Sequence, residues 1–304
     1  MPDGKTESVD KFQTGDGTRV SRDDALYRTG MGNWDACRIP VDRLLSVAST
    51  WQRLLSGVDR PWLCWNVDHD WCVLQQRLVH AVGWTPLVGF DPRVGPPPIE
   101  DDAILIDFNA EFALPTMYPH FVIELAFAFA ERLAFWHSDL LVRLPIMEEL
   151  AGTFARLGDG ELAAVPCRGG IRRRLMPWAQ RYWELIGCTT RGASRDQFEL
   201  GAGWWYNFTR HPNFQGKPTL YGKPYYWDHG TGIMYWARHH KPRVYDIPER
   251  LVAEGHFTSI GAMQYVRQSP NNHTRNLNAD LSANFNLADC ARQLELTRLL
   301  AGRA

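Results

Sequence analysis

The sequence lacks several features that would place it at once in a large class of proteins. No apolar run approaches the roughly 20 residues that a membrane span needs, so we expect no span. The net charge of −1 provides no global basic field, so nucleic acid is not indicated as a partner. The first residues show no basic-then-apolar signal pattern. We therefore expect a cytoplasmic protein.

Motifs of several enzyme classes are also missing. No Walker-type loop and no GxGxxG motif follows a predicted strand, which disfavours ATPases and NAD-dependent enzymes. A serine nucleophile elbow is absent as well. The six cysteines include no CxxC pair, which argues against a zinc ribbon and a disulfide scaffold. We expect reduced, mostly buried thiols at Cys37, Cys64, Cys72, Cys167, Cys188 and Cys290.

What remains is the composition of an ordinary globular protein. With 304 residues, of which 45% are hydrophobic, the chain can bury a substantial core. Residues 1–24 are polar and Gly-rich and are expected to form a flexible arm. We expect an α/β domain over residues 25–213 and a loop-rich C-terminal extension, packed on the same domain, over residues 214–304.

Helices and strands alternate along the first half of the chain. Apolar residues at helical spacing are stopped by Gly57 and again by Gly83, and short apolar runs between them indicate strands. Such alternation is typical of βαβ units and predicts a mostly parallel central sheet with flanking helices. The expected sheet includes strands at residues 63–66, 87–90, 104–106 and 133–136.

The stretch from Phe121 to Val142 organises this pattern. Its first half indicates a buried helix that Arg132 closes, and residues 133–136 are long enough only for a buried strand. His137, Ser138 and Asp139 follow where that strand ends. Ligands of open α/β sheets bind at the carboxyl ends of strands. Two metal-competent side chains are therefore expected at this edge.

Farther along, the pattern predicts a helix at residues 144–157, a strand at 161–166 and a helix at 176–186. Residues 187–213 and 221–236 are dense in Gly, aromatic, His and acidic residues, and we expect site-forming loops there. The pattern also predicts a helix over about residues 287–300.

The loop over residues 168–174 places four arginines beside two glycines. Glycines let backbone N–H groups approach an anion, and arginines supply charge-assisted hydrogen bonds. Arg172 is therefore a candidate for binding phosphate, although a solvated basic loop has the same composition. Asp68 and Asp107, each at or near the end of a predicted strand, are the other polar candidates for cofactor binding.

Together, the alternating strands and the His137-Ser138-Asp139 sequence resemble the nucleotide-sugar-binding fold of the GT-A type glycosyltransferases. That family carries an Asp-any-Asp motif at the same place in the topology, and the resemblance covers roughly residues 61–213. His137 departs from the motif, because it stands where the first acid would be. The resemblance implies a nucleotide-sugar donor, an acceptor that the sequence does not identify, and Mn²⁺ or Mg²⁺ as cofactor.

The chemistry explains why such a motif is needed. Release of a nucleoside diphosphate leaves two charged phosphates, which a hard cation or basic side chains must neutralise. Asp139 can offer an oxygen ligand and His137 an imidazole, which Mn²⁺ accepts more readily than Mg²⁺. The resemblance implies one more ligand from a late histidine. We expect His229, in a loop closing over the cleft, with His256 in reserve; each could instead be a structural histidine.

The resemblance also implies a general base near the start of a late helix. Asp196 and Glu199 are the candidates, with Ser194 as the expected N-cap. Both acids could instead simply complement the helix dipole. Trp204 and Trp205 are expected to stack on a sugar, although core packing is the commoner use of tryptophan.

Two other readings stay open. A metal-dependent hydrolase could use Asp68, His69, His137, Asp139 and His229, although no HExxH motif supports it. The chain could also be a non-catalytic protein that binds a nucleotide or a carbohydrate.

Overall fold

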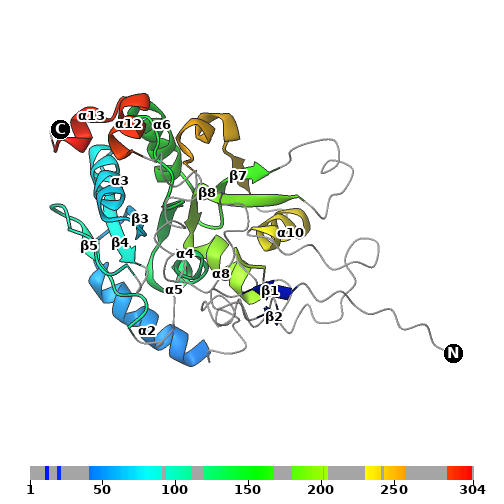
Figure 1. Ribbon diagram of the computed structural model, residues 1–304. Coiled ribbons are helices and arrows are strands. Elements are labelled where there is room, and N and C mark those ends of the chain that lie inside the picture. The colour runs from blue at the N-terminus through cyan, green and yellow to red at the C-terminus, as the bar shows by residue number, and fades with distance from the viewer. Residues whose placement is uncertain are drawn as a thin grey trace.

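The structure is a computed structural model (Figure 1). It describes residues 11–13, 19–21, 41–90, 94–110, 119–167, 180–200, 202–204, 230–240, 243–257 and 286–302. Within the predicted N-terminal arm, it places two short antiparallel strands, β1 (Lys11–Gln13) and β2 (Arg19–Ser21).

A seven-stranded mixed, mostly parallel sheet forms the centre of the α/β fold. Its strand order is β5-β4-β3-β6-β8-β7-β9. Strands β5, β4, β3 and β6 run parallel, whereas β8 runs antiparallel to both neighbours, β6 and β7. The strands are β3 (Pro61–Asn66), β4 (Thr85–Phe90), β5 (Ile104–Leu105), β6 (Arg132–Trp136), β7 (Leu162–Cys167), β8 (Arg181–Thr190) and β9 (Val244–Asp246). The predicted fold class and its four named strands are confirmed.

Helices cover both faces of this sheet. Figure 1 shows α3, α6, α12 and α13 on one side, and α2, α5 and α8 on the other. The α-helices are α2 (Val41–Leu54), α3 (His69–Ala81), α4 (Pro119–Glu124), α5 (Ala126–Phe129), α6 (Leu144–Ala155), α8 (Arg191–Leu200), α10 (Thr231–His239), α12 (Leu287–Gln293) and α13 (Thr297–Leu300). Two 3-10 turns, η5 (Glu249–Leu251) and η6 (Ala253–Gly255), follow β9.

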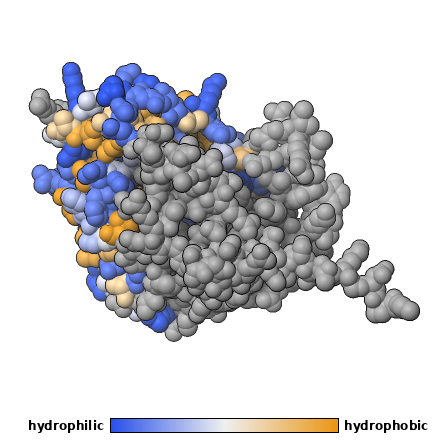
Figure 2. Space-filling model, viewed as in Figure 1, coloured by the Kyte–Doolittle hydropathy of each residue, from blue (hydrophilic) through white to orange (hydrophobic). Residues whose placement is uncertain are grey.

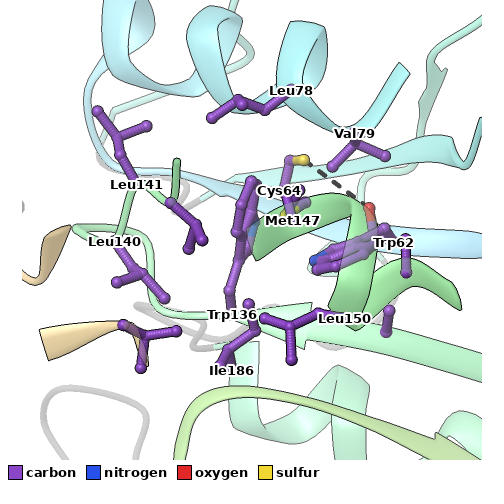
Figure 3. Close-up of a cluster of buried hydrophobic side chains, with 14 of the residues drawn as sticks. Trp62, Cys64, Leu78, Val79, Trp136, Leu140, Leu141, Met147, Leu150 and Ile186 are labelled. Atoms are coloured by element: carbon purple, nitrogen blue, oxygen red, sulfur yellow. Dashed lines mark hydrogen bonds between the residues drawn. The ribbon is translucent and has the colours of Figure 1, made fainter. Parts of the chain in front are cut away.

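Alternation along the strands explains why there are two core clusters. Trp62 and Cys64 of β3 face the α3 and α6 side, whereas Leu63 and Trp65 face α2 and α5. All four are buried, as expected for a strand covered on both faces. Figure 3 shows the first side, where Trp62 and Trp136 lie among the aliphatic side chains of α3 and α6.

The predicted helix ends of the first half agree with the structure. Gly57 and Gly83, just after α2 and α3, adopt positive φ angles of 86° and 73°, which glycine accommodates without strain. Asp68 caps the start of α3 by accepting a hydrogen bond from the Trp71 amide over 3.0 Å.

The prediction of a helix at residues 176–186 is wrong for the part that the structure describes. Residues 181–190 form β8 instead, the ten-residue strand that lies between β6 and β7 and runs antiparallel to both. The strand is favoured because its aromatic and aliphatic side chains pack into the two core clusters on either face of the sheet. Gly187 also permits the close passage of β7, since a β-carbon there would overlap the Ala163 carbonyl oxygen.

The expectation of loops at residues 187–213 and 221–236 is wrong for residues 187–190, which belong to β8, and for residues 231–236, which belong to α10. The helix predicted after Ser194 is present as α8, but it begins at Arg191, so Ser194 lies inside that helix and is not its N-cap. The Ser194 hydroxyl is buried and accepts a hydrogen bond from the Phe127 amide over 3.1 Å. Residues 231–239 form α10, which begins after Gly230 in a left-handed conformation.

Smaller differences concern three boundaries. Arg132 starts β6 and does not close the preceding helix, which is divided at Leu125 into α4 and α5. The predicted C-terminal helix is divided near Glu295, whose φ of 62° is left-handed. Gly302, beyond α13, takes a φ of 69°.

The C-terminal extension is part of the same sheet and core. Its strand β9 pairs with β7 at one edge of the sheet. Leu294 and Leu296 of the C-terminal helical region join the core on the α3 and α6 side.

The surface is mixed in character. Figure 2 shows hydrophilic residues prevailing over the region where Figure 1 places α6, α12 and α13. Among the described helices, none combines the length and the apolar character that crossing a bilayer requires. The five cysteines that the structure describes are buried free thiols, as expected; Cys37 lies outside the described residues.

Candidate metal centre

The first half of the site follows directly from β6. Trp136, the last residue of that strand, is buried in the core, and the His137 amide donates to the Leu185 carbonyl of β8 over 2.9 Å. Directly after Asp139, the chain re-enters the core through Leu140 and Leu141 (Figure 3). The loop that carries His137 and Asp139 is therefore anchored by buried residues at both ends.

A glutamine of α3 also holds the loop that carries His137 and Asp139. The Gln75 side-chain amide donates to the His137 carbonyl over 3.0 Å and to the Leu140 carbonyl over 2.9 Å. Gln75 is completely buried. The His137 carbonyl also accepts from the Leu140 amide over 3.1 Å, so the Gln75 amide adds a second bond there and pairs the Leu140 carbonyl where the strand ends.

The second half of the site comes from the 3-10 turns after β9. His256 follows η6 and forms an antiparallel bridge with Leu140. The Phe257 amide donates to the Asp139 carbonyl over 3.0 Å. A segment remote in sequence is thus attached by backbone hydrogen bonds to the loop after β6.

These contacts bring three potential metal ligands together. The His137 Nδ1 atom lies 3.3 Å from Asp139 Oδ1 and 3.3 Å from His256 Nε2, and the last two atoms are 3.4 Å apart. The three side chains form a group able to hold a metal ion. All three are partly accessible, with side-chain exposures of 32% for His137, 25% for His256 and 14% for Asp139.

The size of this triangle fits a metal ion. Ligand atoms about 2.1 Å from a metal stand about 3.0 Å apart at octahedral angles and about 3.4 Å apart at tetrahedral angles. The observed separations of 3.3 to 3.4 Å fall in this range. Three ligands on one side leave further coordination positions for oxygen atoms of a bound molecule.

The charges of the site are strongly coupled. Burial lowers the pKa of His137, but hydrogen bonds with Asp139 and Glu184 outweigh that effect and raise the pKa to about 10. Burial opposes ionisation of Asp139, yet hydrogen bonds from His137 and His256 hold its pKa well below its usual range. Without a metal, a proton on His137 therefore balances the Asp139 carboxylate at neutral pH.

Glu184 of β8 adds a second carboxylate on the far side of the His137 ring. Its Oε1 atom lies 3.1 Å from His137 Nε2 and 3.0 Å from His120 Nε2. The sequence pattern does not indicate Glu184 or His120 as site residues, and it predicts a helix over the residues around Glu184. A single acid within the otherwise mostly apolar run of β8 is the signal that could have drawn attention to it.

The structure thus brings two of the three predicted metal ligands together. His137 and Asp139 belong to the triangle, and the reserve candidate His256 is its third member. His229 lies outside the described residues, and the loop predicted to close over the site at residues 228–232 is described only from Gly230, directly before α10 begins at Thr231. Of the hydrolase set, Asp68 and His69 are at the start of α3, where His69 Nδ1 lies 3.2 Å from the Asn66 side-chain amide.

The predicted bases are on a different element. Asp196 lies in α8 and accepts a hydrogen bond from the Trp236 indole, while Glu199 is exposed on the same helix. Helix α8 starts at the end of the strands opposite to His137. Thr190, which directly precedes the helix, pairs with Arg132 at the beginning of β6, whereas His137 follows the end of β6. A role of either acid as general base stays a prediction.

The remaining candidates are structural or outside the described chain. Trp204 is 1% exposed and packs edge-on against Phe135 with ring centroids 4.9 Å apart, which favours the core reading. Asp107 accepts from the Asn109 amide in an exposed turn. Arg172 and Trp205 lie outside the described residues.

The fold and the site define an α/β protein with a candidate centre of two histidines and one carboxylate. In comparisons with protein-family models, curated proteins and solved structures, the chain has no match.

Proposed function

We propose that the chain is a metal-assisted glycosyltransferase of the GT-A type, which moves a sugar from a nucleoside-diphosphate donor to an acceptor hydroxyl. The observation that carries the proposal is the triangle of His137, Asp139 and His256 at the carboxyl end of β6. The resemblance places the metal-binding motif of that family after such a strand. The parallel arrangement of β5, β4, β3 and β6 supports the same reading, because ligands bind at the carboxyl edge of parallel strands.

The ligand atoms suit the chemistry of this reaction. A divalent ion held there would neutralise the negative charge that develops on the departing diphosphate. Asp139 supplies an anionic oxygen, and the two imidazoles are neutral donors that leave the ion its positive charge. Ligands with two nitrogens favour Mn²⁺ over Mg²⁺, which binds almost entirely through oxygen.

A metal-dependent hydrolase is the second candidate, because the donor set itself favours it. Two histidines and a carboxylate also hold catalytic zinc, with water in the open position. A non-catalytic binding protein would share the site and lack turnover. The distinction between the three rests on the product that forms.

The proposal can be tested in two stages. First, the melting temperature would be measured with a panel of nucleoside diphosphates, with and without Mn²⁺. We expect stabilisation that requires both components, since a ligand bound only to the native state raises its stability. His256→Ala should abolish the Mn²⁺-dependent part, whereas His80→Ala, which changes an exposed histidine of α3, should not.

Second, nucleotide sugars would be supplied with a set of hydroxyl acceptors. A transferase releases nucleoside diphosphate and forms a glycosylated acceptor, and Asp139→Ala should abolish both while the fold is kept. Hydrolysis of phosphate or acyl esters that needs no acceptor would instead assign the site to a hydrolase. Failure of Mn²⁺, Zn²⁺ and Co²⁺ to bind at all would reject both enzymes and leave a structural hydrogen-bonded cluster.

A further inference from the structure

Glu184 is a buried carboxylate in the middle of the sheet. Its side chain is only 5% exposed, on the antiparallel strand beside β6. A carboxylate in such a place destabilises the fold unless hydrogen bonds or opposite charges compensate for its lost hydration. The partners of Glu184 therefore indicate what the residue is there to do.

Two of these partners are imidazoles. The His137 Nε2 and His120 Nε2 atoms lie 3.1 Å and 3.0 Å from the same oxygen, Glu184 Oε1. His120, at the start of α4, is itself buried, with 7% of its side chain exposed. Glu184 thus joins a partly exposed histidine of the metal triangle to a histidine in the interior.

The geometry of the His137 ring gives this contact its meaning. The two ring nitrogens point in different directions, and Nδ1 faces Asp139 and His256 whereas Nε2 faces Glu184. A carboxylate only accepts hydrogen bonds, so the nitrogen facing Glu184 must carry the hydrogen. In the neutral ring, the lone pair is then on Nδ1, the atom that faces the other two ligands.

We infer that Glu184 is a positioning residue of the metal centre, which fixes the tautomer and the orientation of His137 for binding a divalent ion through Nδ1. The inference rests on the metal site of the proposed function. His120 holds the Glu184 carboxylate in place from the other side. Carboxylates that accept a hydrogen bond from a metal-bound imidazole typically change metal affinity by about 10- to 100-fold when they are replaced.

The test is a calorimetric titration of the full chain with Mn²⁺ and Co²⁺. Glu184→Gln keeps the shape of the side chain, but its amide group can present a donor to His137 and so allow the other tautomer. We expect the dissociation constant to rise about 10- to 100-fold. The visible spectrum of bound Co²⁺ should shift as well, because the His137 ligand is no longer held in one orientation.

Tyr182→Phe is the matched control. Tyr182 is on the same strand and packs with the α2 and α5 side of the core, and its hydroxyl donates to Asp246 over 2.9 Å. This variant removes one polar contact from β8 without touching the triangle, so its metal affinity and Co²⁺ spectrum should equal those of the unaltered protein. The melting temperature of every variant without metal would be measured alongside.

The outcomes separate the two claims. Unaltered affinity and spectrum in Glu184→Gln, with binding abolished in His137→Ala, would overturn the role of Glu184 and keep the metal site. Absence of metal binding by the unaltered protein would overturn both. If Glu184→Gln does not fold, the same titrations would be made with His120→Gln. Weaker metal binding with a shifted Co²⁺ spectrum in this variant supports the inference. Unchanged metal binding overturns it.

Discussion

Gly255 and Leu141 lie so close together that a β-carbon on Gly255 would overlap the Leu141 carbonyl oxygen. The Leu141 amide donates to the Gly255 carbonyl over 3.0 Å in the same contact. Because His256 is the next residue, this backbone approach sets how near its imidazole comes to Asp139. The shape of the triangle of His137, Asp139 and His256 thus depends on the absence of a side chain at one position.

Gly255→Ala should therefore displace η6 and His256. We expect metal affinity to fall at least about tenfold, and overpacking to lower the free energy of unfolding by about 1–3 kcal/mol. Gly152→Ala in α6 is the control, since its β-carbon would meet only the Arg156 guanidinium at an ordinary 3.5 Å. Calorimetric titration and urea unfolding of both variants check the prediction, which equal metal affinity in the two would contradict.

Gln75 and Gln76 offer a comparison between neighbours. Both are fully buried in α3, but Gln75 donates to the carbonyls of His137 and Leu140, whereas Gln76 bonds the backbone of Pro98 and Glu100. Replacing either by Leu removes two hydrogen bonds to backbone groups, at about 1–3 kcal/mol for each group that is left unpaired. Urea unfolding should show similar losses of stability for the two variants.

The Gln75→Leu and Gln76→Leu variants should differ in their affinity for metal. Only Gln75→Leu releases the loop that carries His137 and Asp139, so only this variant should bind Mn²⁺ more weakly. A calorimetric titration at matched temperature measures the difference. If Gln76→Leu weakened binding as much as Gln75→Leu, general destabilisation and not the position of the loop would explain the effect.

Metal binding should release a proton. The metal-free His137 has a pKa of about 10, raised from its ordinary 6.5, so the ring is protonated at pH 7 and must lose that proton to bind a metal. Affinity should therefore rise about tenfold per pH unit until pH approaches 10. Titrations at pH 7 in two buffers of different ionisation enthalpy measure the protons released, and we expect about one per ion.

The raised pKa of His137 should also make the stability of the metal-free protein fall with rising pH, whereas metal affinity rises. Because the folded pKa of His137 is above its ordinary value, its protonation stabilises the native state fully below about pH 6.5, and this contribution is lost as pH rises to about 10. Urea midpoints of the metal-free protein should decline over that window. His137→Gln should decline less, and an equal decline would show that other groups cause it.

Trp62 belongs to the same core cluster as Trp136, the residue directly before His137. Its ring lies 5.3 Å from Trp84, 5.4 Å from Trp136 and 5.2 Å from Phe154, measured between centroids. Trp62→Ala should reduce the free energy of unfolding by about 3–5 kcal/mol, because a large cavity is left. Leu54→Ala, at a position 53% exposed, should change it by less than about 0.5 kcal/mol. Chemical unfolding of both variants measures these values.

The parallel half of the sheet could be predicted because each strand is a short apolar run bounded by turn residues. Pro61–Asn66 is a run of this kind, and the stops at Gly57 and Gly83 mark the helices around it. The strand β8 could not be predicted in this way. Its Glu184 interrupts the apolar pattern, and its structure depends on pairing with β6 and β7 on either side.

The site was predictable only where it is local in sequence. His137 and Asp139 lie two residues apart after one strand, so their proximity follows from the chain itself. The place of His256 in the triangle depends on the contact of η6 with the loop after β6, which no spacing in the sequence encodes. Glu184 was missed for the same reason, since it reaches His137 only through the pairing of two antiparallel strands.

The separation of 119 residues between His137 and His256 has a consequence for biosynthesis. During translation the strand that presents His137 is made long before His256, so an ion held by all three ligands would be captured only when the segment through Phe257 has left the ribosome and docked. At a free ion concentration 100 times the dissociation constant, such capture would add about 2.7 kcal/mol to the stability of the native state. Cellular metal supply would then govern how firmly the late-made segment holds to the part made first.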